Sequence, residues 1–178
     1  MLSKVLVANR GAIARRIIRA CQTLNIASVA VYSEADSEAP YLSEATEAWP
    51  LRGNTAAESY LDQQQLLAAA AAAGADAVHP GYGFLAENAG FATAVIGQGM
   101  RSIGPEPRWI EQMGDKVNGR RMLGDAGMPV FAGSGLIEDM AAAEVFVAEV
   151  GLPVVVKPSG GGGGMGMHVV QTLSLIHI

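Results

Sequence analysis

Apolar and polar positions alternate in long blocks along the amino-terminal part of the chain. Residues 5–8 form an uninterrupted apolar run that ends at the polar turn Asn9-Arg10-Gly11, which predicts a buried parallel strand and a tight turn. Apolar residues then recur at helical spacing from 13 to 24, and a second apolar run covers 27–32. The order strand, helix, strand indicates an α/β fold with a parallel sheet.

The same alternation continues to about position 114. The predicted elements are a strand near Trp49, a helix at 62–73, a strand at 75–79, a helix at 87–97, a strand at 101–103 and a helix at 106–113. Asp62 can cap its helix, Gly74 can end that helix in the left-handed conformation, and the polar stretch 33–40 is expected to be a loop. Helices that connect parallel strands predict a sheet covered on both faces.

The pattern changes after Gly114, where we place a domain boundary. Helices are predicted at 116–126 and 139–150, and the apolar stretches 152–157 and 167–170 predict two strands of a hairpin. One hairpin with two or three helices is too little to close a hydrophobic core alone.

Composition and charge exclude several classes of protein. The 12 Lys and Arg residues against 17 Asp and Glu give a net charge of −5, which argues against binding to nucleic acid or anionic lipid. The longest apolar stretch, 66–73, is far too short for a membrane span. Cys21 is the single cysteine, as expected of a cytoplasmic protein. The cluster Arg15, Arg16 and Arg19 is expected to be a solvated helix face.

A glycine run is the strongest local signal for chemistry. All residues from Gly160 to Gly166 are glycine except Met165, and the run lies between two predicted strands. Each glycine costs about 0.5–1 kcal/mol relative to alanine, so such density is not kept for stability. Bare backbone can bring several N–H groups against phosphate oxygens, which favours a phosphate-binding loop over the alternative, a flexible linker. The candidate contacts are Gly160, Gly161, Gly162, Gly163 and Gly164.

Two lysines are candidates for the same phosphate. Lys157 ends the apolar strand before the glycine run, where an ammonium group is costly to bury without an anionic partner. Lys116 opens a helix after Met113-Gly114-Asp115. The alternatives stay open, because Lys157 can extend its ammonium group to water and Lys116 taken alone fits an ordinary surface residue.

Dinucleotide binding is a weaker possibility. The turn Asn9-Arg10-Gly11 lies where dinucleotide-binding folds carry GxGxxG, but it supplies one of those glycines. Glu34 and Asp36 lie at about the distance of the acid that binds a ribose. The sequence therefore predicts a Rossmann-like fold without the dinucleotide.

The segment 79–88, HPGYGFLAEN, lies between a predicted strand and a predicted helix. Its turn follows the carboxyl end of the strand, where open α/β sheets bind ligands. It fits equally well a structural turn with Tyr82 and Phe84 packed in the core, and both interpretations stay open.

Four motifs in this order and spacing resemble the amino-terminal part of biotin carboxylase, over residues 2 to about 170. They are VLVANRGAIARRIIRAC, HPGYGFLAEN, MGDK and VVVKPSGGGGGMGM. The resemblance implies an ATP-grasp ligase that uses ATP and Mg²⁺ to join bicarbonate to biotin on a carrier protein. It also implies a Rossmann-like preATP-grasp domain at 1–114, followed by an incomplete ATP-grasp domain at 115–172.

The resemblance assigns roles to several residues. Lys116 and Lys157 match the lysines that the family uses on ATP phosphates, and 160–164 match the lid loop that closes over them. Tyr82 and Glu87 match residues that face the biotin and lid side of the site.

Partners are implied in the same way: a biotin carboxyl carrier protein or domain, a carboxyltransferase and a second copy of the chain, since Arg19 falls on a helix used in homodimers. The family's catalytic residues and Mg²⁺ ligands would lie beyond Val170, so we expect no catalytic residue here and no activity from this chain alone. Residues 173–178, LSLIHI, resemble a translated sequencing adapter and are expected to be non-native. Departures from the family pattern stand at Ala12, Ala86 and Met165.

Two rival functions remain. Another ATP-grasp ligase, such as a carbamoyl-phosphate synthetase, also has a glycine loop and two lysines, but HPGYGFLAEN resembles the carboxylases better. A non-catalytic nucleotide-binding module built on the first sheet belongs to a different class, and a complete GxGxxG would have favoured it.

Overall fold

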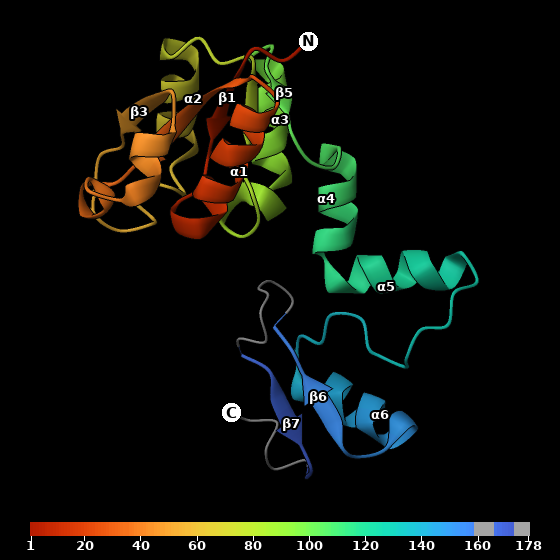
Figure 1. Ribbon diagram of the computed structural model, residues 1–178. Helices are drawn as coiled ribbons and strands as arrows, with labels where there is room; N and C mark the ends of the chain where they lie inside the picture. Colours follow the sequence, from red (N-terminus) through yellow and green to blue (C-terminus); the bar gives the residue numbers. More distant parts are fainter. Residues whose placement is uncertain (159–165, 173–178) are drawn as a thin grey trace. The chain divides into compact units, whose positions relative to one another are not determined.

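The computed structural model describes residues 1–158 and 166–172 (Figure 1). The predicted phosphate loop at 160–164 and the predicted non-native tail at 173–178 lie outside the described residues. The chain divides into two compact units, Met1–Glu111 and Gln112–Ile178. Each unit is described by itself.

Unit 1 is built on a parallel sheet of five strands in the order β3-β2-β1-β4-β5. The strands are β1 (Lys4–Val7), β2 (Ala27–Tyr32), β3 (Glu47–Pro50), β4 (Ala77–His79) and β5 (Arg101–Ser102). The chain runs from β1 outward to β3, then returns to place β4 on the other side of β1. The predicted α/β class and parallel sheet are confirmed, and the order reverses between β1 and β4.

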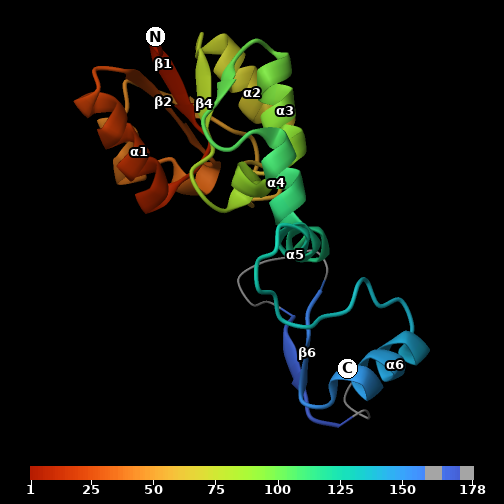
Figure 2. The ribbon, with the colours of Figure 1, turned by 90° about the vertical axis from the view of Figure 1, so that its right-hand side faces the viewer.

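Helices cover both faces of this sheet, as predicted (Figure 2). The helices are α1 (Gly11–Thr23), α2 (Gln63–Ala72) and α3 (Ala89–Gly97). Side chains of β1 alternate between two cores: Val5 and Val7 pack with Ile18 of α1, whereas Leu6 packs with Leu66 of α2. Each of these five side chains is at most 1% exposed. The burial of one such side chain stabilises the fold by about 1.5–3 kcal/mol.

Helix ends follow the predicted signals in α2 and depart from them in α3. The Asp62 side chain accepts hydrogen bonds from the N–H groups of Gln64 and Gln65, and Gly74 adopts a φ of +64° after the helix. The helix predicted at 87–97 begins two residues later, because Asn88 is extended and its side chain accepts from the N–H of Phe91. A short 3₁₀ turn, η3 (Phe84–Glu87), precedes it.

The stretch predicted as a loop after β2 also contains two 3₁₀ turns. They are η1 (Glu34–Asp36) and η2 (Pro40–Glu44). The second turn packs on α1 and buries Tyr41, whose hydroxyl donates to the carbonyl oxygen of Val31 at 2.9 Å.

Helix α4 (Pro107–Gly114) spans the division between the units, and unit 2 begins within it at Gln112. Unit 2 contains α5 (Lys116–Asp125), α6 (Met140–Val150), β6 (Val154–Val156) and β7 (His168–Val170). The two strands pair antiparallel, so the predicted hairpin is confirmed. The buried apolar residues of unit 2, within the described part, are Ala143, Val147 and Val170. That this segment is too short to close a core alone stays a prediction.

Candidate functional site

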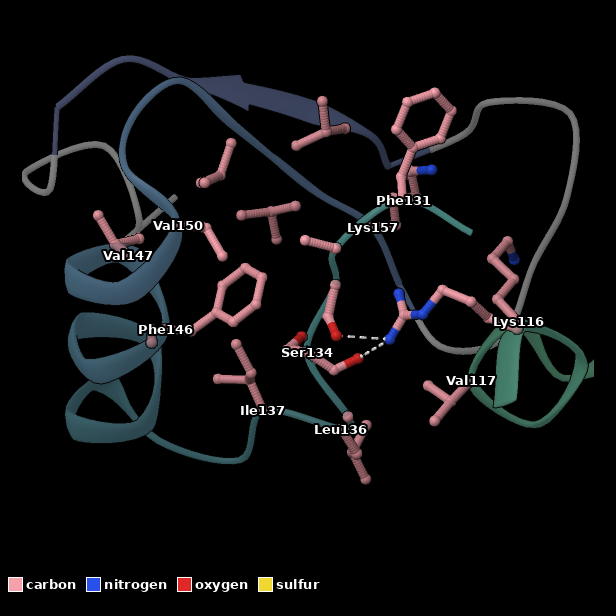
Figure 3. A pocket seen from close by; sticks show the side chains of 18 of the residues that line it. Lys116, Val117, Phe131, Ser134, Leu136, Ile137, Phe146, Val147, Val150 and Lys157 are labelled. Carbon is pink, nitrogen blue, oxygen red and sulfur yellow. Dashed lines mark hydrogen bonds between the residues drawn. The ribbon is translucent and has the colours of Figure 1, made fainter. Parts of the chain in front are cut away.

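A cavity of about 610 Å³ lies in unit 2 between α5, α6, β6 and the connecting segment before α6 (Figure 3). Its walls are mainly apolar. The apolar residues lining it include Val117, Phe131, Leu136, Ile137, Phe146, Val147, Val150, Val154, Val155 and Val156. A space of this size with mainly apolar walls fits a small organic ligand.

Three cations line the same cavity: Lys116, Arg120 and Lys157. Lys116 is the first residue of α5, Arg120 lies one turn later on the same face, and Lys157 follows β6 directly. The described lining includes no Asp or Glu. The structure therefore brings the two predicted lysines to one cavity, and the balance of charge there favours an anionic ligand.

Arg120 is a member of this cavity that the sequence analysis missed. Its Nη2 donates to the carbonyl oxygen of Gly133 at 2.8 Å and also to that of Ser134 (Figure 3). The signal that could have found it is its spacing, because residues i and i+4 of a helix share a face, and Lys116 had already been singled out.

A second candidate site lies in unit 1, where the strand order reverses between β1 and β4. This is the position at which open α/β sheets bind ligands. Tyr82 and Glu87, both predicted to face ligand, are exposed here, Tyr82 to 72%. Phe84 instead stacks on Tyr60 with ring centroids 5.6 Å apart, so of the two aromatic residues expected in a purely structural turn only Phe84 packs inward.

Asn9 organises this turn, and the sequence analysis gave it no such role. Its side chain is fully buried, and Nδ2 donates to the carbonyl oxygens of Pro80 at 2.7 Å and Tyr82 at 3.0 Å. Its Oδ1 accepts from the N–H of Arg10 at 2.9 Å. Gly81 adopts a φ of +72°, and a Cβ there would lie 2.9 Å from Asn9 Nδ2. The asparagine therefore fixes the turn that carries Tyr82.

Asp36, a candidate for ribose binding, is occupied by partners from its own unit. It accepts from Arg10 Nε at 2.6 Å and from the Tyr60 hydroxyl at 2.6 Å. The hydrogen bond from Arg10 is the main cause that holds the pKa of Asp36 below its usual value. In this structure the carboxylate of Asp36 therefore serves contacts within unit 1.

The arginine cluster of α1 is exposed, as expected, but two of its members pair with an acid on η2. Arg15 Nε lies 2.6 Å from Glu44 Oε1 and Arg19 Nε 2.8 Å from Glu44 Oε2. These bonds, with that from Arg19 the strongest, lower the pKa of Glu44 to about 2. The role of Arg19 at a partner subunit stays a prediction.

Other kinds of site find no support in the described residues. No group of three or more His, Cys, Asp or Glu side chains there is arranged to hold a metal ion. His79 at the end of β4 is half-buried, its Nδ1 accepts from the N–H of Gly81 at 3.0 Å, and burial lowers its pKa. No helix in this part of the chain is long and apolar enough to cross a membrane.

Comparison with known proteins covers both units. Residues 1–110 match the family described as biotin carboxylase, N-terminal domain, and residues 115–177 match the ATP binding domain of the carbamoyl-phosphate synthase L chain. The chain is 50% identical over 176 residues to the biotin-dependent acyl-coenzyme A carboxylase alpha3 subunit of Mycobacterium leprae. The match covers 98% of this chain and 29% of that protein. It is 49% identical to the biotin carboxylase of Pseudomonas aeruginosa, over 96% of this chain and 38% of that one.

Comparison with solved structures also identifies biotin carboxylase domains as similar. The biotin carboxylase domain of Hydrogenobacter thermophilus 2-oxoglutarate carboxylase, a dimer in complex with MgADP, ADP and bicarbonate, matches with a TM-score of 0.95 and 42% identity. The match covers 99% of this chain and 39% of that one. The chain thus spans well under half the length of these relatives. With the family match extending over more than half of its residues, the chain belongs to the biotin carboxylase N-terminal domain family.

Proposed function

We propose that this chain forms the amino-terminal part of a biotin carboxylase, an ATP-dependent ligase that carboxylates biotin on a carrier protein with bicarbonate. The observation that carries the proposal is the cavity of unit 2, where the described lining holds three cations and no acid around a largely apolar space. A nucleoside triphosphate combines a flat, uncharged base with a strongly anionic tail. These two parts match the apolar and the cationic portions of the lining.

The residues of this chain act in binding and positioning. The ammonium groups of Lys116 and Lys157 would hold phosphate oxygens, as the resemblance to the family implies. Gly160, Gly161, Gly162, Gly163 and Gly164 would cover the phosphates with backbone N–H groups. Closing a cover over the nucleotide excludes water, which protects any intermediate that water would hydrolyse.

The exposed turn of unit 1 has a separate role in this proposal. Tyr82 and Glu87 would face biotin, as the resemblance to the family implies. They lie on a turn that Asn9 holds through hydrogen bonds to the carbonyl oxygens of Pro80 and Tyr82. Bicarbonate activation by ATP and deprotonation of biotin would depend on groups outside this chain, so no catalytic residue is assigned to it. The described residues do not fit Mg²⁺, because they offer no cluster of carboxylates, and no step assigned here passes through the metal.

Partners follow from the same proposal. A biotin carboxyl carrier protein or domain delivers the biotin, a carboxyltransferase uses the carboxylated product, and Arg19 contacts a second copy of the chain. The Hydrogenobacter thermophilus structure is a dimer, which supports a second copy of the chain as a partner. A cytoplasmic location is proposed from the single cysteine.

A chimera tests the proposal. Residues 1–172 of this chain are joined to the part of the Pseudomonas aeruginosa biotin carboxylase that follows the matching segment, and ADP release is measured with bicarbonate and free biotin. We expect biotin-dependent ADP release that K116M and K157M each weaken through a raised KM for ATP. The control is R121M, since Arg121 lies beside Arg120 on α5 but does not line the cavity.

The rival functions give different results. A chimera in which K116M and K157M leave the KM for ATP unchanged would contradict the assignment of the cavity to the nucleotide. Tight binding of NAD(H) to the chain, measured by fluorescence titration, would instead favour a dinucleotide-binding module. The occupied carboxylate of Asp36 speaks against that outcome.

A further inference from the structure

The segment 129–137 forms one wall of the cavity but belongs to no helix or strand. It contributes Phe131, Leu136 and Ile137 to the lining, and Phe131 is 97% exposed. Within the part of the chain that the structure describes, this segment makes no backbone hydrogen bond to another backbone group. Because backbone hydrogen bonds do not fix this segment, side-chain contacts must restrict its conformational freedom if it is to form an ordered wall.

Arg120 makes such contacts. The two hydrogen bonds from its Nη2, to the carbonyl oxygens of Gly133 and Ser134, are the hydrogen bonds that tie the segment to α5 among the described residues. One planar guanidinium that engages two successive carbonyl groups fixes both the distance and the orientation of the backbone it holds. Because Lys116 lies one turn earlier on α5, the same contact sets the position of the wall relative to a predicted phosphate-binding group.

The Arg120 guanidinium can lie against the backbone of residue 133 because this residue is glycine and has no side chain. A Cβ at this position would lie 1.9 Å from Nη1 and 2.5 Å from Cζ of Arg120. The backbone of Gly133 does not adopt the left-handed conformation, so the requirement for glycine comes from the guanidinium and not from backbone strain. The end of an arginine side chain can move aside at little cost, so an alanine here would displace the guanidinium and leave the fold intact.

We propose that Arg120 is a positioning residue of the nucleotide cavity, which holds the wall at 131–137 against α5 through the carbonyl groups of Gly133 and Ser134. The inference rests on the proposed function, since it takes the ligand of the cavity to be a nucleotide. Arg120 acts through the wall, so the loss of its contacts raises the KM for ATP and leaves kcat nearly unchanged.

The first measurement needs no nucleotide. Heteronuclear NOE values of the backbone amides at 131–137 report motion on the picosecond to nanosecond scale in the 178-residue chain. We expect R120M, R120K and G133A each to lower these values, whereas R121M leaves them unchanged. Unchanged values in R120M, with far-UV circular dichroism equal to that of the parent chain, would overturn the inference.

The second measurement uses the chimera described above and separates KM from kcat. Loss of both hydrogen bonds from a charged donor is expected to raise the KM for ATP about tenfold in R120M. R120K keeps the charge but loses the planar guanidinium whose Nη2 reaches both carbonyl groups. G133A keeps the arginine but displaces it, so both variants are expected to resemble R120M. Full rescue by R120K would show that the guanidinium geometry is not required and would overturn the positioning role assigned to it.

The two proposals fail in different ways. If the wall loosens in R120M while the KM for ATP stays unchanged, the positioning role is refuted, and the nucleotide site still stands on Lys116 and Lys157. If K116M and K157M have no effect on the KM for ATP, the proposed function itself fails.

Discussion

Replacing Asn9 by alanine is expected to destabilise unit 1 far more than its small change in volume suggests. The side chain is fully buried and makes three hydrogen bonds, two of them as a donor to carbonyl groups in the turn after β4. Alanine removes all three and leaves the carbonyl groups of Pro80 and Tyr82 without this partner. A neutral hydrogen bond contributes about 0.5–1.5 kcal/mol to stability, so the loss amounts to about 3 kcal/mol.

Urea denaturation of the 178-residue chain, followed by tryptophan fluorescence and circular dichroism, measures this loss. With a slope of about 2 kcal/mol per molar urea for a domain of this size, N9A should lower the midpoint by roughly 1.5 M. N9D is expected to cost at least as much at pH 7, because a carboxylate accepts hydrogen bonds and cannot donate to the two carbonyl groups. The matched control is N54A, since Asn54 is exposed in the same unit.

The result that would refute this reasoning is a free energy of unfolding for N9A within about 0.5 kcal/mol of N54A, a difference typical of surface substitutions. Equal stability of N9D and the parent chain at pH 7 would refute the assigned direction of the hydrogen bonds. Either result would mean that the turn keeps its shape without the amide.

Two further predictions concern the same edge of the sheet. G81A should be clearly less stable in urea than G83A, because both glycines have positive φ but only at Gly81 would a Cβ also meet Asn9 and Ile13; equal losses would assign the whole effect to backbone strain. The Asp36 carboxyl has a lowered pKa in the folded state, mainly through Arg10, so its contribution is present at pH 7 and is lost as the pH falls below about 4. The stability gap between the parent chain and D36N should therefore shrink on acidification, and a gap independent of pH between 7 and 3 would contradict the assignment.

Much of the fold could be predicted because local signals and tertiary packing agree. The strand at 27–32 has the bounds that its apolar run indicated, and Asp62 and Gly74 bound their helix as expected. The helix predicted from 87 begins at Ala89 because Asn88 is extended and its side chain caps the helix by accepting from the N–H of Phe91. Hydrophobic periodicity does not reveal such a cap, so the first residue of the helix was predicted too early in the sequence.

The site was predictable where a motif carries its own chemistry and not where contacts join distant segments. Lys116 and Lys157 were candidates from their sequence context and the family resemblance, and both line the cavity; their role toward phosphate stays a prediction. Arg120 looks like a surface residue of a polar helix until Gly133 and Ser134 are placed beside it. Asn9 likewise acquires its role only when β4 pairs with β1 and brings Pro80 within reach.

The borders of the parallel sheet have a consequence for behaviour at high concentration. One border is β3, which ends in Pro50 and carries Glu47, and the other is β5, which has two residues. Proline offers no N–H to an added strand, and a two-residue strand exposes few unpaired backbone groups. Edge-to-edge pairing between the sheets of two copies is thereby disfavoured. Even at high protein concentration, this unit is not expected to polymerise by strand addition.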